Sequence, residues 1–375
     1  MAGIYIHTPF CKTRCNYCDF YSTVQSELTD DFINALCIEL QNRKDYINNE
    51  AVETIYFGGG TPSQLSIIQL DKIFNTISKH YSFASDMEIT LEANPDDLSL
   101  NYLKELTHLP VNRLSIGIQT FNDEMLTKLN RRHNAKQAKE AVKNAQDYGF
   151  HNLSIDLMYG LPNETLQEWE NDLKEAILLD PEHISAYHLI YEKGTKLYNY
   201  LKKGYVKEVD EEISLQFFKK LIDYLTNSNY EHYEISNFAK KSKYAKHNTS
   251  YWLGKTYLGC GPSAHSYNTK TRDYNNVSLK KYIDTMRLNK SCITTEELSL
   301  ETQYNDYIIT GLRTRWGVSL NNIKINFGNK LHTYALNMAQ KHIKNGHLIV
   351  NKDHLILSKQ GIFISDGIMS DLIFV

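Results

Sequence analysis

Three of the six cysteines lie within eight residues, in the segment Cys11-Lys-Thr-Arg-Cys15-Asn-Tyr-Cys18. Thiolates are soft ligands suited to iron-sulfur clusters and to zinc. A structural zinc site needs a fourth ligand, which His7 or Asp19 can supply. With three thiolates, a four-iron cluster keeps one iron without a protein ligand, and that position can bind a substrate or cofactor. We expect an iron-sulfur cluster, with zinc as the alternative.

Glycines or polar side chains follow three further predicted strands. The loop Phe57-Gly58-Gly59-Gly60-Thr61-Pro62 follows the second strand, and glycines without a Cβ let a ligand approach the backbone closely. Glu92 follows the third strand and Gln119 the fourth. A carboxylate and an amide at these positions suit ribose hydroxyls. Taken alone, the glycine loop is equally typical of a tight turn before a helix, and polar residues such as Glu92 and Gln119 are more often caps or solvated rim residues.

Asp156 places a charge within an otherwise apolar segment, residues 154–158. Burying this carboxylate unpaired would cost several kcal/mol, so it needs a partner or a ligand. Arg131 is a candidate partner, or a candidate for holding a ligand carboxylate through a charge-assisted hydrogen bond. Arg132 competes for the same role, and spacing separates the two only weakly.

The elements that must position these residues follow an alternating pattern up to about residue 190. Short β-branched runs alternate with amphipathic stretches, which is typical of a parallel sheet covered by helices. Six strands are predicted, at residues 4–7, 54–57, 88–91, 113–118, 154–158 and 184–189. Thr29 and Thr165 are predicted helix N-caps. Because a closed barrel has eight units, we expect an α/β fold with an open, partial (β/α)6 barrel that binds ligands at the carboxyl ends of its strands.

The alternation stops after residue 190. A charged segment over 192–212 precedes a predicted helix at 214–227. Beyond residue 296 we predict a helix carrying Tyr304, Ile308 and Leu312, a helix near 332–345 and a hairpin over 347–357, which together resemble a winged-helix module. This module lacks a concentrated basic stripe, so packing against the barrel is favoured over nucleic-acid binding. The predicted divisions are a partial barrel (1–190), a connecting region (191–295) and a small α+β module (296–375).

Composition indicates a folded protein of two or three domains. The 375 residues are 42% hydrophobic and 23% charged, close to the globular average. The 41 Lys and Arg residues nearly balance the 44 Asp and Glu residues, so the chain as a whole has no electrostatic attraction to nucleic acid or anionic lipid. No stretch reaches the roughly 18 apolar residues of a membrane span, and no secretory signal is evident. We therefore expect a cytoplasmic protein without a membrane span or a disulfide framework.

The CxxxCxxC spacing of Cys11, Cys15 and Cys18, on a loop after the first strand of a six-unit barrel, resembles the radical S-adenosylmethionine (SAM) superfamily. The resemblance implies a [4Fe-4S] cluster on these cysteines, with the amino and carboxylate groups of SAM on the open iron. Tyr17 matches the aromatic residue that this motif usually carries. The residues implied to contact SAM are Tyr5, Gly60, Thr61, Glu92, Gln119, Arg131 and Asp156, with Tyr187 as an adenine-side candidate.

Further stretches resemble the HemN/HemW branch of that superfamily over nearly the whole chain. They are Tyr5-Ile-His7-Thr-Pro-Phe-Cys11, the GGGTP loop, Tyr159-Gly-Leu-Pro and the small C-terminal module. The branch contains oxygen-independent coproporphyrinogen III dehydrogenases, which are radical decarboxylases of porphyrin biosynthesis, and haem chaperones, which bind haem and pass it on. The dehydrogenases carry a fourth cysteine where this chain has Phe20. The chain also has the HNxxYW motif of the chaperones, at His247-Asn-Thr-Ser-Tyr251-Trp252.

The resemblance therefore implies a haem chaperone, with a coproporphyrinogen III dehydrogenase as the alternative; whether SAM is cleaved stays open. It implies that His247 ligates haem iron and that Tyr251 and Trp252 face the macrocycle. A structural histidine packed beside aromatics is the other interpretation of the motif. The expected partners are haem and an acceptor protein, and we hypothesise that cluster binding organises a homodimer interface. Cys260 is expected to be a buried thiol rather than a ligand, although its role and that of His265 stay open.

Overall fold

The computed structural model describes residues 2–375, and its central feature is a set of six parallel strands in chain order. The strands are β1 (Ala2–Thr8), β2 (Val52–Gly59), β3 (Phe83–Ala93), β4 (Arg113–Gln119), β5 (Leu153–Tyr159) and β6 (His183–His188). All six predicted strands are confirmed. Their side chains are largely buried on both faces, because helices cover one face and the interior of the curved sheet encloses the other.

Six further strands extend this sheet at both edges. They are β7 (Glu231–Glu234), β8 (Asn237–Ala239), β9 (Tyr257–Cys260), β10 (His265–Tyr267), β11 (Thr271–Tyr274) and β12 (Thr294–Glu297). The spatial order is β12-β11-β10-β9-β1-β2-β3-β4-β5-β6-β8-β7, and β9 runs parallel to β1. The segment between the barrel and the C-terminal module therefore adds strands to the same sheet.

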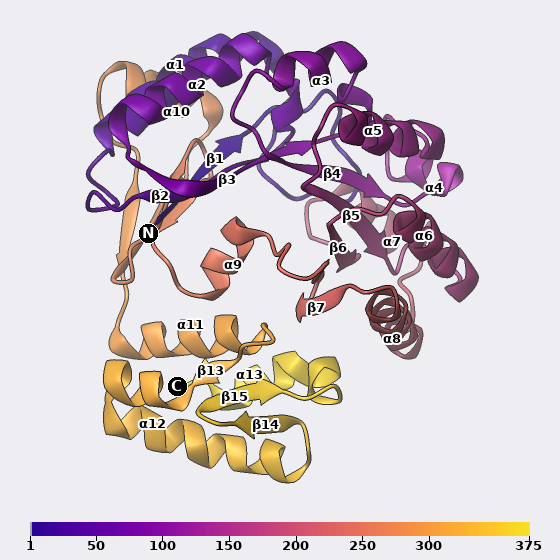
Figure 1. The fold of residues 1–375 in the computed structure, drawn as a ribbon, viewed down its shortest axis with the longest axis vertical. Coiled ribbons are helices and arrows are strands. Elements are labelled where there is room, and N and C mark those ends of the chain that lie inside the picture. Colours follow the sequence, from indigo (N-terminus) through magenta and orange to yellow (C-terminus); the bar gives the residue numbers. More distant parts are fainter. Residues whose placement is uncertain (1) are drawn as a thin grey trace.

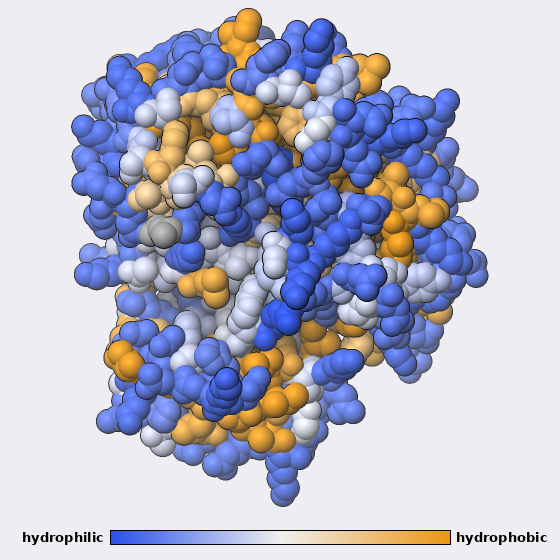
Figure 2. All heavy atoms as spheres, in the orientation of Figure 1, coloured by the Kyte–Doolittle hydropathy of each residue, from blue (hydrophilic) through white to orange (hydrophobic). Residues whose placement is uncertain are grey.

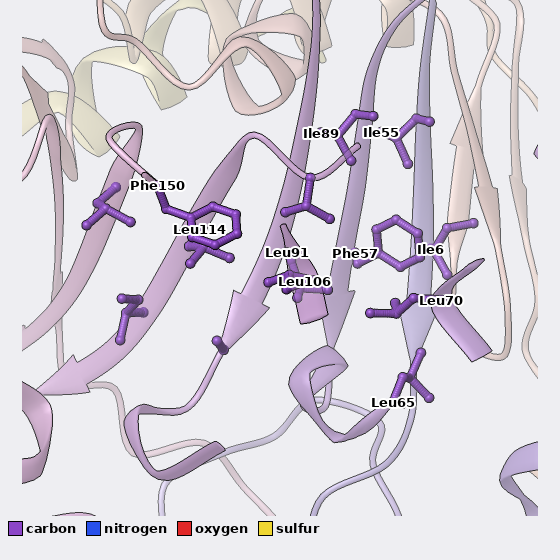
Figure 3. Packing of buried hydrophobic residues seen from close by; sticks show 14 of the residues in the cluster. Ile6, Ile55, Phe57, Leu65, Leu70, Ile89, Leu91, Leu106, Leu114 and Phe150 are labelled. Atoms are coloured by element: carbon purple, nitrogen blue, oxygen red, sulfur yellow. The ribbon is translucent and has the colours of Figure 1, made fainter. Parts of the chain in front are cut away.

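Helices connect the strands, and most of them pack on the outer face of the curved sheet (Figure 1). They are α1 (Thr29–Asn42), α2 (Ile67–His80), α3 (Leu100–Leu106), α4 (Asp123–Lys128), α5 (Ala135–Asp147), α6 (Leu166–Leu178), α7 (Lys196–Lys202), α8 (Glu211–Asn227), α9 (Lys246–Trp252) and α10 (Leu279–Arg287). Short 3-10 helices cover Ser26–Leu28, Pro62–Gln64 and Pro95–Asp97. Figure 3 shows Ile6, Phe57 and Leu91 of neighbouring strands meeting Leu70 and Leu106 of the covering helices. This apolar layer fixes the strand ends that carry the site.

The two predicted N-caps have different outcomes. Thr165 caps α6 in a capping box with Glu168, as predicted. The prediction for Thr29 is wrong, because Thr29 is already the first residue of α1 and makes no capping bond. Its hydroxyl donates instead to the Ser26 carbonyl at 2.7 Å, which ties α1 to the preceding 3-10 turn.

Helix α9 is an exception to the outer layer, because it lies on the inner side of the curved sheet (Figure 1). The His247 and Lys246 backbone amides donate to Glu88 of β3, and the His247 ring lies against Thr54 of β2. The predicted open barrel is therefore partly filled from within by its own chain.

The C-terminal module has a separate hydrophobic core centred on Tyr304, Ile308 and Leu312. Its elements are α11 (Leu300–Leu312), β13 (Val318–Ser319), α12 (Leu320–Lys344), β14 (Leu348–Asn351), β15 (His354–Leu357), a 3-10 helix (Gly361–Ile364) and α13 (Ser365–Leu372). The predicted helices and hairpin are present, with strand order β13-β15-β14. The module packs below the barrel in Figure 1, and Figure 2 shows hydrophobic side chains gathered over part of it. Within residues 2–375, no helix is long and apolar enough to cross a membrane.

Candidate functional site

A cavity of about 440 Å³ opens at the carboxyl ends of the parallel strands. Nine of the predicted site residues line it: Cys11, Cys15, Cys18, Gly60, Thr61, Glu92, Gln119, Arg131 and Asp156. Tyr187, the adenine-side candidate, lines it as well. Tyr5 and His247 are not part of the lining. The structure thus brings together residues that span 145 positions of the sequence, and most of them follow different strands.

The cysteine loop is held against two other site loops. The Thr61 hydroxyl donates to Cys11 Sγ at 3.3 Å, and Arg131 Nη1 donates to Cys15 Sγ at 3.4 Å. Backbone bonds pair Cys11 with Thr23 and Asn16 with Leu129. Donors aimed at two of the sulfurs favour thiolates, so the donor set fits a cluster bound by three cysteines.

Burial raises the pKa of Cys11, and it raises that of Cys18 to about 11. In the metal-free chain these thiols are therefore protonated at neutral pH, and metal ligation must displace their protons. Among residues 2–375, no three His, Cys, Asp or Glu side chains are arranged to hold a single metal ion.

The glycine loop lies beside the cysteine loop because Gly60 lacks a side chain. A Cβ on Gly60 would lie 2.7 Å from the Phe10 carbonyl oxygen and 2.9 Å from that of Thr8. The Gly60 amide donates to Thr8 at 2.7 Å, so the two backbones are in direct contact. Glycine is therefore required here for close packing of the cluster loop.

At the end of β4, Gln119 adopts a positive φ of 73° where the register with β5 shifts. Non-glycine residues rarely adopt this conformation, and such strain gathers at functional sites. The distortion directs the Gln119 side chain into the cavity, where the sequence predicted a ligand contact.

The two neighbouring arginines have different partners. Arg131 lies in the cavity wall, where its guanidinium donates to Asn94 Oδ1 at 2.8 Å and to the Gly117 carbonyl. Arg132 forms ion pairs with Asp96 at 2.6 Å and with Asp97 at 3.1 Å, outside the cavity. The geometry therefore favours Arg131 as the residue that meets a ligand.

Two carboxyl groups face the cavity. Burial raises the pKa of Glu92 to about 7, although the Tyr56 hydroxyl donates to Glu92 Oε1 at 2.7 Å. Burial also raises the pKa of Asp156, which accepts from the Ser115 hydroxyl at 3.3 Å. The partners of Asp156 are thus the Ser115 and Ser185 hydroxyls, and the ion pair with Arg131 considered from the sequence is absent. Both carboxyl groups retain acceptor capacity for hydroxyls in the cavity.

His247 and Tyr5 lie beneath the cavity. The His247 side chain is 1% exposed, and both of its ring nitrogens have partners: Nδ1 lies 2.8 Å from Thr54 Oγ1 and Nε2 lies 2.7 Å from the Tyr251 hydroxyl. Its ring stacks on Tyr56, with centroids 5.1 Å apart. In this conformation His247 is a fully bonded, buried histidine.

The other two aromatics of the HNxxYW segment are also in contact with the protein. Tyr251 meets Tyr257 edge to face at 4.5 Å, and the Arg313 guanidinium of the C-terminal module lies 5.2 Å from the Trp252 ring. Cys260 is fully buried in the main core, as expected. His265 is exposed and stacks on Tyr274.

Several cavity residues escaped the sequence analysis, above all Arg113, Tyr56 and Ile190. Arg113 carried a usable signal, because it is a charge in an apolar strand, just as Asp156 is. The exposed side chains of Phe20 (63%) and Ile190 (65%) line the same cavity. No sequence pattern connects these two positions.

Comparison with known proteins agrees with this geometry. The model of the radical SAM superfamily matches residues 5–176, and that of the HemN C-terminal domain matches residues 298–364. The heme chaperone HemW of Bacillus subtilis is 37% identical over 364 residues, covering 96% of each chain. This chain belongs to the HemW-like branch of the radical SAM superfamily. HemW of Escherichia coli is 35% identical over 299 residues, covering 76% of this chain and 77% of that protein.

The solved structure of the E. coli coproporphyrinogen III oxidase HemN, described as a radical SAM enzyme, has the same fold. Its TM-score is 0.86 at 23% identity, covering 99% of this chain and 90% of that one. The expected α/β class, with a radical SAM core and a HemN-type C-terminal module, is thereby confirmed. At this identity the likeness concerns architecture, so it does not distinguish between the activities of the HemN/HemW branch.

Proposed function

We propose that this protein is a haem chaperone, which binds haem and transfers it to an acceptor protein. The HemW relatives carry that name, and one of them covers 96% of the chain. The observation that carries the choice within the branch is Phe20, which lines the cavity where the dehydrogenases have their fourth cysteine. The HNxxYW segment on α9 supports the same choice.

In the proposed site, Cys11, Cys15 and Cys18 hold a [4Fe-4S] cluster, and SAM lies in the cavity. When bound, the cluster supplies an open iron for the amino and carboxylate groups of SAM, together with one electron. Thr61 and Arg131 donate toward the cysteine sulfurs, which stabilises their ionised form.

The remaining cavity residues orient the nucleoside. Glu92 and Asp156 accept hydrogen bonds from its ribose hydroxyls, and the Gln119 amide adds a donor. Tyr187, which is partly exposed at the cavity wall, offers a flat face to the adenine. Tyr5 acts from behind the wall, where its ring stacks against Tyr56.

Haem is the cargo, and His247 is the residue proposed to ligate its iron. A histidine needs a free nitrogen to ligate iron. Because Thr54 of β2 occupies Nδ1, freeing that nitrogen for iron requires α9 to move relative to the barrel, whereas Tyr251 lies on α9 itself and stays beside Nε2. Such a movement also breaks the bonds of the Lys246 and His247 amides to Glu88, so haem binding must offset their loss.

The test uses the anaerobically reconstituted full chain. We expect haem titration of the wild type to give a saturable Soret change, His247→Ala to weaken it at least about tenfold, and apomyoglobin to withdraw the haem. His354→Ala, an exposed histidine of the C-terminal module, is the matched control. Failure of the wild type to bind haem, or formation of protoporphyrinogen from coproporphyrinogen III and SAM, would overturn the proposal.

A further inference from the structure

Arg113, at the start of β4, is a buried cation without a partner. Its side chain is 1% exposed and lines the floor of the cavity. Within residues 2–375 it makes no side-chain hydrogen bond or ion pair, and its Nε is buried and unpaired. A guanidinium carries five N–H donors, and burying such a charge unpaired costs several kcal/mol.

The acidic groups nearest in the cavity do not satisfy this charge. Glu92 receives its hydrogen bond from Tyr56, and both oxygens of Asp156 lie 3.3 Å from the Ser115 hydroxyl. The Arg113 charge lowers the pKa of both carboxyl groups, although burial outweighs it. Neither carboxylate is in ion-pair contact with Arg113. An apolar residue of similar size would fill this position at a lower energetic cost.

The two cavity arginines mark two separate positions for anions. Arg131 binds the Gly117 carbonyl and Cys15 Sγ, at the cluster end of the cavity. Arg113 precedes Gly117 by four residues on β4, which corresponds to about 13 Å along a strand. A carboxylate held by Arg131 beside the cluster therefore leaves Arg113 free for a different anion.

Arg113 lies next to α9. Its charge contributes to the lowered pKa of His247, so the two side chains are within electrostatic reach. Tyr56 lies between the cavity and the His247 ring, and Asn248 of α9 contributes to the lining. The floor of the cavity is thus built from Arg113 and from the helix that carries the proposed haem ligand.

We propose that Arg113 is a carboxylate subsite at the floor of this cavity and binds one propionate of the haem that His247 ligates. The inference rests on the proposed function. A propionate is an anion on a short flexible arm, and it matches the fork of a guanidinium. The carboxylate of SAM has the same chemistry, so the test must distinguish these two sources.

The first arm compares haem with its dimethyl ester, which lacks both negative charges. We expect the wild type to bind haem about 10 to 150 times more tightly than the ester, since hydrogen bonds to charged groups contribute about 1.5–3 kcal/mol. Arg113→Met should remove this preference, and Arg113→Lys should retain part of it. Arg287→Met, at an exposed ion pair with Asp31, is the matched control.

The second arm compares SAM with decarboxylated SAM on the same variants, and Arg113→Met should leave their ratio of affinities unchanged. Loss of that ratio would assign the subsite to SAM and overturn the haem assignment. A wild type that binds haem and its ester equally would also overturn it while leaving the chaperone function intact. If the wild type bound no haem, both the propionate subsite and the proposed chaperone function would be wrong. Urea unfolding checks the fold, and we expect Arg113→Met to be at least as stable as the wild type, because it removes an unpaired buried charge.

Discussion

His247 Nδ1 and Thr54 Oγ1 lie 2.8 Å apart inside the barrel, joining α9 to β2. The bond between His247 Nε2 and the Tyr251 hydroxyl lies within α9, so the two bonds together occupy both nitrogens of the proposed haem ligand, but only the Thr54 bond links the ring to the barrel. Each such bond contributes about 0.5–1.5 kcal/mol net, an amount that ligand binding can offset. Under the proposed function, this closed arrangement is the haem-free state of the protein, and haem binding shifts it to a state in which His247 is free.

Thr54→Val tests that equilibrium. Removing the hydroxyl weakens the closed state by about 1 kcal/mol, so the open state becomes about fivefold more populated. We expect haem association, followed by stopped-flow absorbance, to accelerate by a similar factor, and the free energy of unfolding to fall by about 1–3 kcal/mol. Thr226→Val, at an exposed position of α8, is the control. An unchanged association rate would show that α9 does not gate haem binding.

Buried neutral histidines make the fold sensitive to acid. Burial lowers the pKa of His247 to about 3 and those of His133 and His232 to about 4, from 6.5. Below pH 6.5 the unfolded chain binds more protons at these sites than the folded chain does, so stability falls as the pH drops from 6.5 toward 4. Each histidine contributes a slope of up to about 1.4 kcal/mol per pH unit. Urea unfolding between pH 4.5 and 7.5 measures the slope, and His247→Gln should reduce it; an equal slope in that variant would contradict the assignment.

Gly60→Ala probes the contact between the glycine and cysteine loops. The new methyl would lie 2.7 Å from the Phe10 carbonyl oxygen, so the cysteine loop must shift. We expect a loss of about 1–3 kcal/mol in unfolding free energy and a lower content of iron and acid-labile sulfide after reconstitution. Gly367→Ala, whose Cβ would have no heavy atom within 4 Å, should have neither effect. Full iron loading of the Gly60 variant would show that the loop tolerates the shift.

The parts of the fold that follow from local pattern could be predicted from the sequence. The strands that carry Glu92 and Asp156 are apolar runs. Glu92 was predicted from its place at the end of a parallel strand, and Asp156 from the cost of burying a charge in an apolar run. Short edge strands lack such a pattern. β12, for example, is Thr-Thr-Glu-Glu with all four side chains exposed, and its pairing with β11 defines it.

The position of α9 could not be predicted, because it depends on contacts between distant parts of the chain. His247 is 193 residues from Thr54, and its helix has only seven residues. The HNxxYW motif therefore predicted that His247 is free to ligate iron, whereas the structure shows both of its nitrogens hydrogen-bonded. The place of Arg113 in the cavity was predictable in the same way as that of Asp156, because both are charged residues of an otherwise apolar strand.

The affinity for SAM should depend on the ionisation of Glu92. Burial raises its pKa to about 7, and ribose hydroxyls donate to the ionised form, so SAM binding should strengthen as the pH rises through about 7. Without SAM, the free energy of unfolding should change with pH in the opposite direction. The folded protein favours protonated Glu92 more than the unfolded chain does, so Glu92 contributes less to stability as the pH rises from 4.5 through about 7. Calorimetric titration with SAM between pH 5.5 and 8.5 measures the first effect.

Two variants separate Glu92 from other groups that titrate. Tyr56→Phe removes the 2.7 Å hydrogen bond that favours the Glu92 carboxylate, so the midpoint of SAM binding should move to higher pH. Glu92→Gln should remove this pH dependence altogether. Glu164→Gln is the control, since burial also raises the pKa of Glu164, to about 8, but its side chain does not line the cavity. If Glu164→Gln shifted the pH midpoint of SAM binding and Tyr56→Phe did not, the pH dependence would reflect titration elsewhere in the protein and not the contact between Glu92 and the ribose.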